Sequence, residues 1–123
     1  MAYLSKKEIG KKGEELAVAF LKEKGFEILH QNYRYGKGEI DIIVKDPEDG
    51  YTVFVEVKTR QNLDYGDPEY AITKNKQKQV KKIAELYFYE NEIKELECRF
   101  DVIAILLENI NSPVINHYVN AFM

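Results

Sequence analysis

Two short runs of alternating residues, joined by a turn, place the strongest constraint on how this chain can fold. The first run is Glu39–Val44, "EIDIIV", and the second is Thr52–Thr59, "TVFVEVKT". Pro47–Gly50, "PEDG", lies between them and has the composition of a turn. Runs rich in β-branched and aromatic residues, bounded by turn residues, are typical of strands. We therefore expect the two runs to pair as a β-hairpin.

Helical spacing of apolar residues predicts one helix before this hairpin and one after it. The first is predicted over residues 6–24, because Ser5–Glu8 has the spacing of a capping box and Gly25 is a natural stop. The second is predicted over residues 74–91, with Thr73 as its cap. Its apolar stripe consists of Val80, Ile83, Ala84, Tyr87 and Phe88.

The remaining segments read as strands and loops. The further predicted strands are Phe26–Gln31, Cys98–Leu107 and Val114–Val119, and the predicted loops are Asn32–Gly38 and Arg60–Ile72. The order α-β-β-β-α-β-β predicts an α/β protein with one mixed five-stranded sheet flanked by helices. A length of 123 residues suits one domain, so we expect residues 1–123 to form it.

Charge and cysteine content narrow the class of protein. The net charge of −3 argues against a protein that coats nucleic acid by bulk charge, although Lys74–Lys82 contains five lysines that can form a local basic face. The N-terminal segment has no apolar signal core, and no apolar run approaches the roughly 20 residues that span a bilayer. The single Cys98 cannot form an internal disulfide. We therefore expect a cytoplasmic protein that has no membrane partner.

Alternation along the two strands of the hairpin gathers charged side chains on one face. The aliphatic residues of each strand share a face, and these are Ile40, Ile42 and Val44 in the first strand and Val53, Val55 and Val57 in the second. If the two aliphatic faces coincide, Asp41, Glu56 and Lys58 lie together on the opposite face. The pattern thus predicts a cluster of two carboxylates and an ammonium group.

Two neighbouring carboxylates repel each other unless a cation lies nearby. Lys58 could offset one charge, and a divalent metal could hold both Asp41 and Glu56. Mg²⁺ prefers oxygen ligands and typically takes one or two carboxylates, so the pair predicts a Mg²⁺ or Mn²⁺ site. Helical spacing places Glu14 at the edge of the apolar stripe of the first helix, which makes it a third candidate ligand.

Cationic and polar residues near these acids are candidates for contacts with nucleic acid. Lys76 and Gln77 lie in the first turn of the second predicted helix, where anions are favoured, and could meet phosphate or an attacking water. Arg34 and Lys37 lie in the predicted loop before the hairpin, and Arg60 follows its second strand. These five residues are candidates for contacts with phosphate groups.

The sequence around the acids resembles a known nuclease motif. "GEID", Gly38–Asp41, followed after a turn by "FVEVKTR", Phe54–Arg60, is similar to the PD-(D/E)xK motif, with Ile40 in place of its usual proline. Residues 10 to 122 further resemble the YraN-like family of small bacterial proteins, which are similar to archaeal Holliday-junction resolvases. The segments that carry this resemblance are "GKKGEELAVAFL", "GEIDIIV", "VFVEVKTR", "YGDPEYAITKNKQKQV", "CRFDVIAI" and "NAF".

The resemblance implies a restriction-endonuclease-like fold and metal-dependent hydrolysis of phosphodiester bonds in DNA, including branched intermediates of recombination and repair. It makes Asp41, Glu56 and Lys58 the catalytic set, with Glu14 as a further metal-site acid. In the implied mechanism, the bound metal lowers the pKa of a water, and Lys58 orients that water or stabilises negative charge. It also implies a homodimer that presents two active sites.

Several alternatives stay open from the residues alone. A catalytically inactive nucleic-acid-binding module on the same fold would keep the acids without turnover, and a protein-interaction adaptor would bind no DNA. Glu56 and Lys58 could form an ordinary solvated strand face, and Glu14 could be a surface residue. For Asp101 we favour structural support, through a pair with Arg99, Arg60 or a tyrosine, over a direct catalytic role.

Overall fold

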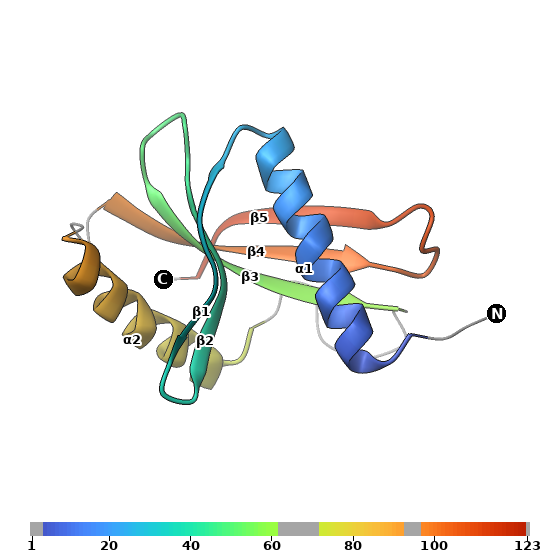
Figure 1. The fold of residues 1–123 in the computed structure, drawn as a ribbon, viewed down its shortest axis with the longest axis horizontal. Helices are drawn as coiled ribbons and strands as arrows, with labels where there is room; N and C mark the ends of the chain where they lie inside the picture. The colour runs from blue at the N-terminus through green and yellow to red at the C-terminus, as the bar shows by residue number, and fades with distance from the viewer. Residues whose placement is uncertain (1–3, 62–71, 93–96, 123) are drawn as a thin grey trace.

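The computed structural model describes residues 4–61, 72–92 and 97–122, and within these ranges it contains two helices and five strands (Figure 1). The elements are α1 (Lys6–Glu23), β1 (Glu27–Tyr35), β2 (Gly38–Lys45), β3 (Thr52–Arg60), α2 (Lys74–Asn91), β4 (Cys98–Leu106) and β5 (Val114–Phe122). This confirms the predicted order α-β-β-β-α-β-β. Neither described helix is both long and apolar enough to cross a membrane.

The five strands form one mixed sheet in the order β1-β2-β3-β4-β5. β1 with β2, β2 with β3 and β4 with β5 are antiparallel pairs, whereas β3 and β4 are parallel. A parallel pair needs a crossover connection, and α2 lies in the segment that joins β3 to β4. The predicted hairpin of β2 and β3 and the mixed five-stranded sheet are both confirmed.

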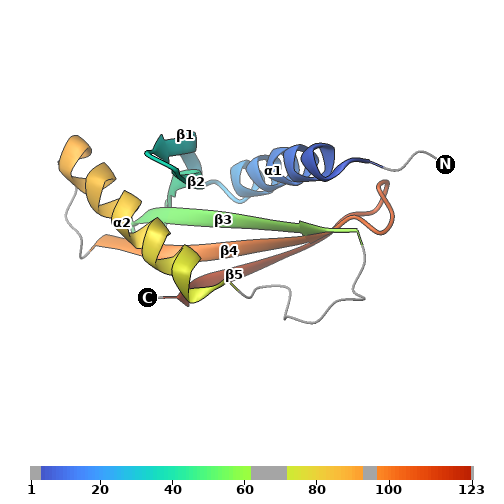
Figure 2. The same cartoon turned by 90° about the horizontal axis from the view of Figure 1, so that it is seen from below.

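The two helices pack on opposite faces of the sheet. Successive side chains of β3 point to opposite faces, so this strand contributes to the core under each helix. Val53 and Val55 belong to the core on the α1 side, whereas Phe54 belongs to the core on the α2 side. α1 lies above β3 in Figure 2. The predicted apolar stripe of α2 is buried in full: Val80, Ile83, Ala84, Tyr87 and Phe88.

Side-chain caps fix where both helices begin. The Ser5 hydroxyl accepts a hydrogen bond from the Glu8 N–H, and the Glu8 carboxylate accepts one from the Ser5 N–H, so the predicted capping box is present. The Thr73 hydroxyl accepts a hydrogen bond from the Lys76 N–H at the start of α2. The cap on α2 thereby fixes the turn that carries the Lys76 side chain.

The prediction of a loop over Asn32–Gly38 is wrong for most of these residues. β1 continues to Tyr35, and the turn that joins it to β2 is only Gly36 and Lys37. Asn32 adopts a left-handed backbone with φ of 53°, which its short polar side chain tolerates. Pairing with β2 overrides the turn preference of this segment. Most of the second predicted loop, residues 62–71, lies outside the described residues.

The prediction that Ile40 shares a face with Ile42 and Val44 is also wrong. Ile40 packs in the core on the α2 side, whereas Ile42 and Val44 pack on the α1 side. The reason is a change of direction in β2. Its pairing with β3 ends at Ile42 opposite Val55, and the preceding part of β2 leaves with β1, away from β3 (Figure 1). Asp41 lies at this split between β2 and β3.

Candidate functional site

Asp41 lies at the point where β2 separates from β3. The β2–β3 ladder ends at Val55, and two residues further along β3 the Val57 N–H donates a hydrogen bond of 2.8 Å to Asp41 Oδ2. The Asp41 carboxylate thus accepts the hydrogen bond that a backbone carbonyl of β2 would accept if the pairing continued. This hydrogen bond fixes the Asp41 carboxylate beside β3, where its charge acts on the Glu56 carboxyl group.

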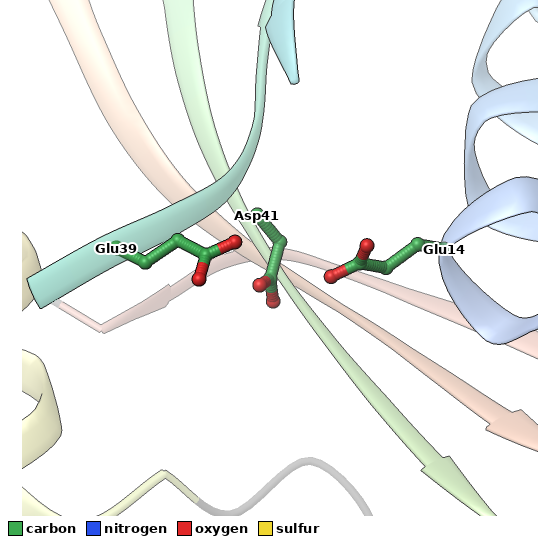
Figure 3. Close-up of side chains that lie close together, drawn as sticks. All are labelled: Glu14, Glu39 and Asp41. Atoms are coloured by element: carbon green, nitrogen blue, oxygen red, sulfur yellow. The ribbon is translucent and has the colours of Figure 1, made fainter. Parts of the chain in front are cut away.

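Three carboxylates converge on the α1 side of this split (Figure 3). Glu14 comes from α1, Asp41 and Glu39 come from β2, and one oxygen of each lies within 4.8 Å of the others. Asn32 Nδ2 donates to Glu39 Oε1 at 2.6 Å and to Glu14 Oε2 at 3.2 Å. The amide group of Asn32 therefore holds the two glutamates on either side of Asp41.

Close packing of α1 on β3 brings Glu14 to the cluster. Gly13 is buried, and a Cβ atom built on it would overlap the side chain of Thr59 on β3. Only glycine allows the backbone of α1 to approach the Thr59 side chain this closely. The next residue, Glu14, is consequently held near the sheet, which agrees with the predicted position at the edge of the apolar stripe.

Glu56 is buried on the α2 side of the sheet, close to the ammonium group of Lys76. The residue is 4% exposed, its Oε2 lies 3.7 Å from Lys76 Nζ, and its Oε1 has no hydrogen-bond partner in the part of the chain that the structure describes. Lys76 Nζ also donates to the backbone carbonyl of Glu39 at 3.2 Å and to Gln79 Oε1 at 3.3 Å. Lys76 thus joins α2 to both strands that carry the acids.

Burial raises the pKa of both central carboxyl groups. Loss of solvation, reinforced by the negative charge of Asp41 and opposed by Lys76, raises the pKa of Glu56 to about 8. Loss of solvation also raises the pKa of Asp41 to about 6; the Val57 hydrogen bond opposes this rise and the charge of Glu14 adds to it. At neutral pH the pair therefore retains a proton unless another cation joins it.

Lys58 and Arg60 follow Glu56 along β3. β3 pairs with β4 in a regular parallel register from Thr52 to Arg60, so Lys58 shares the face of Glu56 by alternation. Both cationic residues are half-buried. Lys58 is thus placed two residues from the acid, as the motif requires.

The other predicted contacts with nucleic acid differ in their distance from the acids. Arg34 Nε lies 3.6 Å from Glu39 Oε2, and its side chain is 74% exposed. Lys37 is exposed in the turn between β1 and β2. Gln77 Nε2 donates a hydrogen bond of 2.9 Å to the backbone carbonyl of Ile72, so this side chain supports the start of α2. The structure brings Arg34 and Lys76, but not Gln77, to the carboxylates.

Two members of the cluster were missing from the predicted site. Glu39 lies two residues before Asp41, and the period of a strand could have indicated it, although the bend at Asp41 breaks that period locally. Nothing in the sequence indicated Asn32 as a member of the site. Its segment has the composition of a loop, and its contacts depend on the pairing of β1 with β2.

Asp101 belongs to a separate buried network. Its Oδ1 accepts hydrogen bonds from Arg99 Nε at 3.0 Å and from the Asn120 N–H at 2.9 Å, and its Oδ2 lies 2.7 Å from His117 Nε2. Arg99 Nη1 also contacts Asp46 Oδ2 at 2.8 Å. Burial works against the charge of Asp101, but the hydrogen bonds from His117 and Arg99 hold its pKa below the usual value. The predicted pair of Asp101 with Arg99 is confirmed, and it joins β4 to β5 and to the β2–β3 turn.

Comparison with known proteins matches nearly the whole chain to one family. Residues 13–105 match the uncharacterised protein family UPF0102. A UPF0102 protein of Pelobacter propionicus is 46% identical over 113 residues, which cover 92% of this chain and 81% of the relative. A UPF0102 protein of Caldicellulosiruptor saccharolyticus is 46% identical and covers 97% and 100%. A UPF0102 protein of Chloroherpeton thalassium is 48% identical and covers 87% and 81%.

Proposed function

The chain belongs to the uncharacterised protein family UPF0102, as its YraN-like segments predicted, and we propose that it is a divalent-metal-dependent nuclease that hydrolyses phosphodiester bonds in DNA. The family description names no activity, so the proposal rests on the acid cluster. The observation that carries it is Glu56 Oε1, a buried carboxylate oxygen without a hydrogen-bond partner among the described residues. Such an atom is costly unless a proton or a cation meets it.

The donor set fits a hard cation in the number and type of its oxygens. Asp41, Glu56 and Glu14 are the proposed ligands, and Glu39 offers a further carboxylate within 4.8 Å of Asp41 and Glu14. Oxygen ligands of this kind suit Mg²⁺ or Mn²⁺. When bound, the ion would supply a Lewis acid for the scissile phosphate and a water of lowered pKa. The Val57 N–H and the Asn32 amide would orient Asp41 and Glu14 as ligands.

Two lysines would act on the reacting phosphate. Lys58 shares the face of Glu56, so its ammonium group would orient the attacking water or stabilise the negative charge that develops on the phosphate oxygens. Lys76 lies at the start of α2 and already contacts Glu56 and the Glu39 carbonyl. Once Glu56 has another cation partner, Lys76 would be free to contact a phosphate oxygen.

Cationic side chains near the acids would hold the DNA backbone. Arg34 beside Glu39 and Lys37 in the β1–β2 turn lie on one side, and Arg60 lies at the end of β3. Gln77 would contact DNA only by giving up its hydrogen bond to Ile72, so we assign it the smallest contribution.

A cleavage assay tests the proposal. Labelled duplex, flapped and branched DNA would be incubated with the parent protein in Mg²⁺, in Mn²⁺ and in EDTA. We expect cleavage only with metal, and a loss of about 100-fold or more for Asp41→Ala and Lys58→Ala. Glu85→Gln, which changes an exposed acid on α2, is the control and should cleave as the parent does. Equal cleavage by the parent and both alanine variants would identify a contaminating nuclease and reject the proposal.

A further inference from the structure

A groove of about 450 Å³ lies between the first half of α1 and the end of β3. Its lining includes Lys6 and Gly10 from α1 and Val57 and Thr59 from β3. Glu14 also lines it, and the same residue is a member of the acid cluster. The groove therefore adjoins the candidate metal site.

Gly10 keeps the α1 wall of this groove open. Gly13, one turn later, is explained by packing, because a Cβ there would overlap Thr59. Gly10 has no such explanation, since a Cβ built on it would meet no heavy atom within 4 Å among the described residues. Glycine inside a helix is less favourable than alanine. Gly10 thus lines the groove without filling it, and a larger side chain at this position has room to enter the groove.

The chemistry of the lining suits one nucleotide. Lys6 supplies a cation for a phosphate, Ile9 and Val57 supply apolar surface for a sugar or a base, and Thr59 supplies a hydroxyl group. A volume of about 450 Å³ falls within the range of small-ligand sites, whereas a duplex would not enter it. A nucleotide would therefore have to leave the base stack to occupy the groove.

We propose that the groove binds an unpaired nucleotide next to the scissile phosphodiester bond, so that the protein acts on DNA with a single-stranded region. The inference rests on the proposed nuclease function and specifies its substrate. The groove selects for unpaired DNA by size, and Glu14 connects the bound nucleotide to the metal-site acids.

The test compares two labelled DNAs by fluorescence anisotropy in Ca²⁺: a duplex with a short unpaired tail, and the same duplex fully paired. Gly10→Phe fills the groove from a position where a Cβ has free space. We expect it to bind the tailed duplex about tenfold more weakly than the parent does, with the paired duplex unaffected. Ala19→Phe adds the same ring at an exposed position of α1 and should bind both DNAs as the parent does.

Calorimetric titration with Mn²⁺ separates this inference from the proposed function. If Gly10→Phe keeps the Mn²⁺ affinity of the parent and binds only the tailed duplex more weakly, the groove inference is supported. Two results with a parent that binds Mn²⁺ and DNA would overturn the groove inference and leave the nuclease proposal standing. In the first, Gly10→Phe binds the tailed duplex as tightly as the parent does. In the second, Gly10→Phe loses the same amount of affinity for both duplexes. If the parent binds neither Mn²⁺ nor DNA, both are rejected.

Discussion

Glu56 is the most deeply buried of the four acids at the candidate site. Burial, together with the charge of Asp41, raises its pKa to about 8 from a usual value of 4.5. The folded protein therefore binds more protons than the unfolded chain between these two pH values. By linkage, the contribution of Glu56 to the free energy of unfolding of the metal-free protein decreases as pH rises through this interval, and the raised pKa of Asp41 acts in the same direction.

We expect the thermal midpoint of the parent in EDTA to fall by about 5 °C or more as the pH rises from about 5 to 8. Glu56→Gln keeps the size of the side chain but cannot ionise, so its midpoint should change much less and should exceed that of the parent at pH 8. Calorimetry at several pH values measures both. Glu85→Gln, at an exposed position, should keep the slope of the parent. A parent midpoint that stays constant or rises over this range would contradict the assigned environment of Glu56.

Lys76 is the counterion that a bound metal would partly replace. Its ammonium group lies 3.7 Å from Glu56 Oε2, where it attracts the carboxylate and repels any second cation. Lys76→Met should therefore bind Mn²⁺ at least about threefold more tightly by calorimetry, while cleavage falls because a phosphate contact is lost. Lys78→Met, exposed on the same helix, should leave Mn²⁺ affinity unchanged. Weaker Mn²⁺ binding by Lys76→Met would show that Lys76 does not compete with the metal.

Among the elements, α1 and β3 form the contact that positions the site. The contact depends on Gly13, where any side chain meets Thr59. Gly13→Ala should lower the free energy of unfolding by about 2–3 kcal/mol, because backbone atoms must move apart to fit the methyl group. Gly10→Ala on the same helix should instead raise it by about 0.5–1 kcal/mol. Urea unfolding measures both, and two changes of the same sign would refute this account of the packing.

The network around Asp101 joins β4 and β5 to the turn between β2 and β3. Asp101→Asn should cost about 3 kcal/mol, because Arg99 keeps its buried charge and loses a charged partner. Since its pKa is lowered in the folded state, Asp101 stabilises the parent above the usual aspartate range, and this contribution is lost as the pH falls through the folded pKa.

Urea unfolding at neutral pH and below about pH 4 checks both statements. The difference between the parent and Asp101→Asn should shrink at the lower pH. Asp49→Asn, whose side chain is 43% exposed, should cost less than about 1 kcal/mol. If Asp101→Asn leaves the free energy of unfolding unchanged, the stability of this region comes from other contacts.

The sequence predicted those elements whose signals are local. The capping box at Ser5 and the stripe that begins at Val80 need only neighbouring residues, and both helices were found. The end of β1 was missed because Asn32 becomes part of a strand only through β2. The face of Ile40 was missed because β2 changes direction at the end of its pairing with β3. Local patterns thus indicated Glu14, Asp41 and Glu56 as candidates, whereas the position of Glu39 beside them depends on tertiary contacts.

Over the whole molecule, the acid cluster exists because three elements meet at the split in the sheet. α1 supplies Glu14 and β2 supplies Asp41 and Glu39. Glu56 of β3 interacts with Asp41 and lies beside Lys76 of α2. These residues are far apart in the sequence, so an unfolded chain has no comparable site. Binding of a metal to the cluster must consequently stabilise the folded protein.

The most direct test of the metal site is anomalous diffraction from a crystal soaked in Mn²⁺. The proposal predicts a manganese peak between the carboxylates of Asp41 and Glu56, with Glu56 Oε1 as a ligand and Lys76 moved away from Glu56. A crystal at saturating Mn²⁺ with no peak at that position, and with Lys76 still paired to Glu56, would contradict the account.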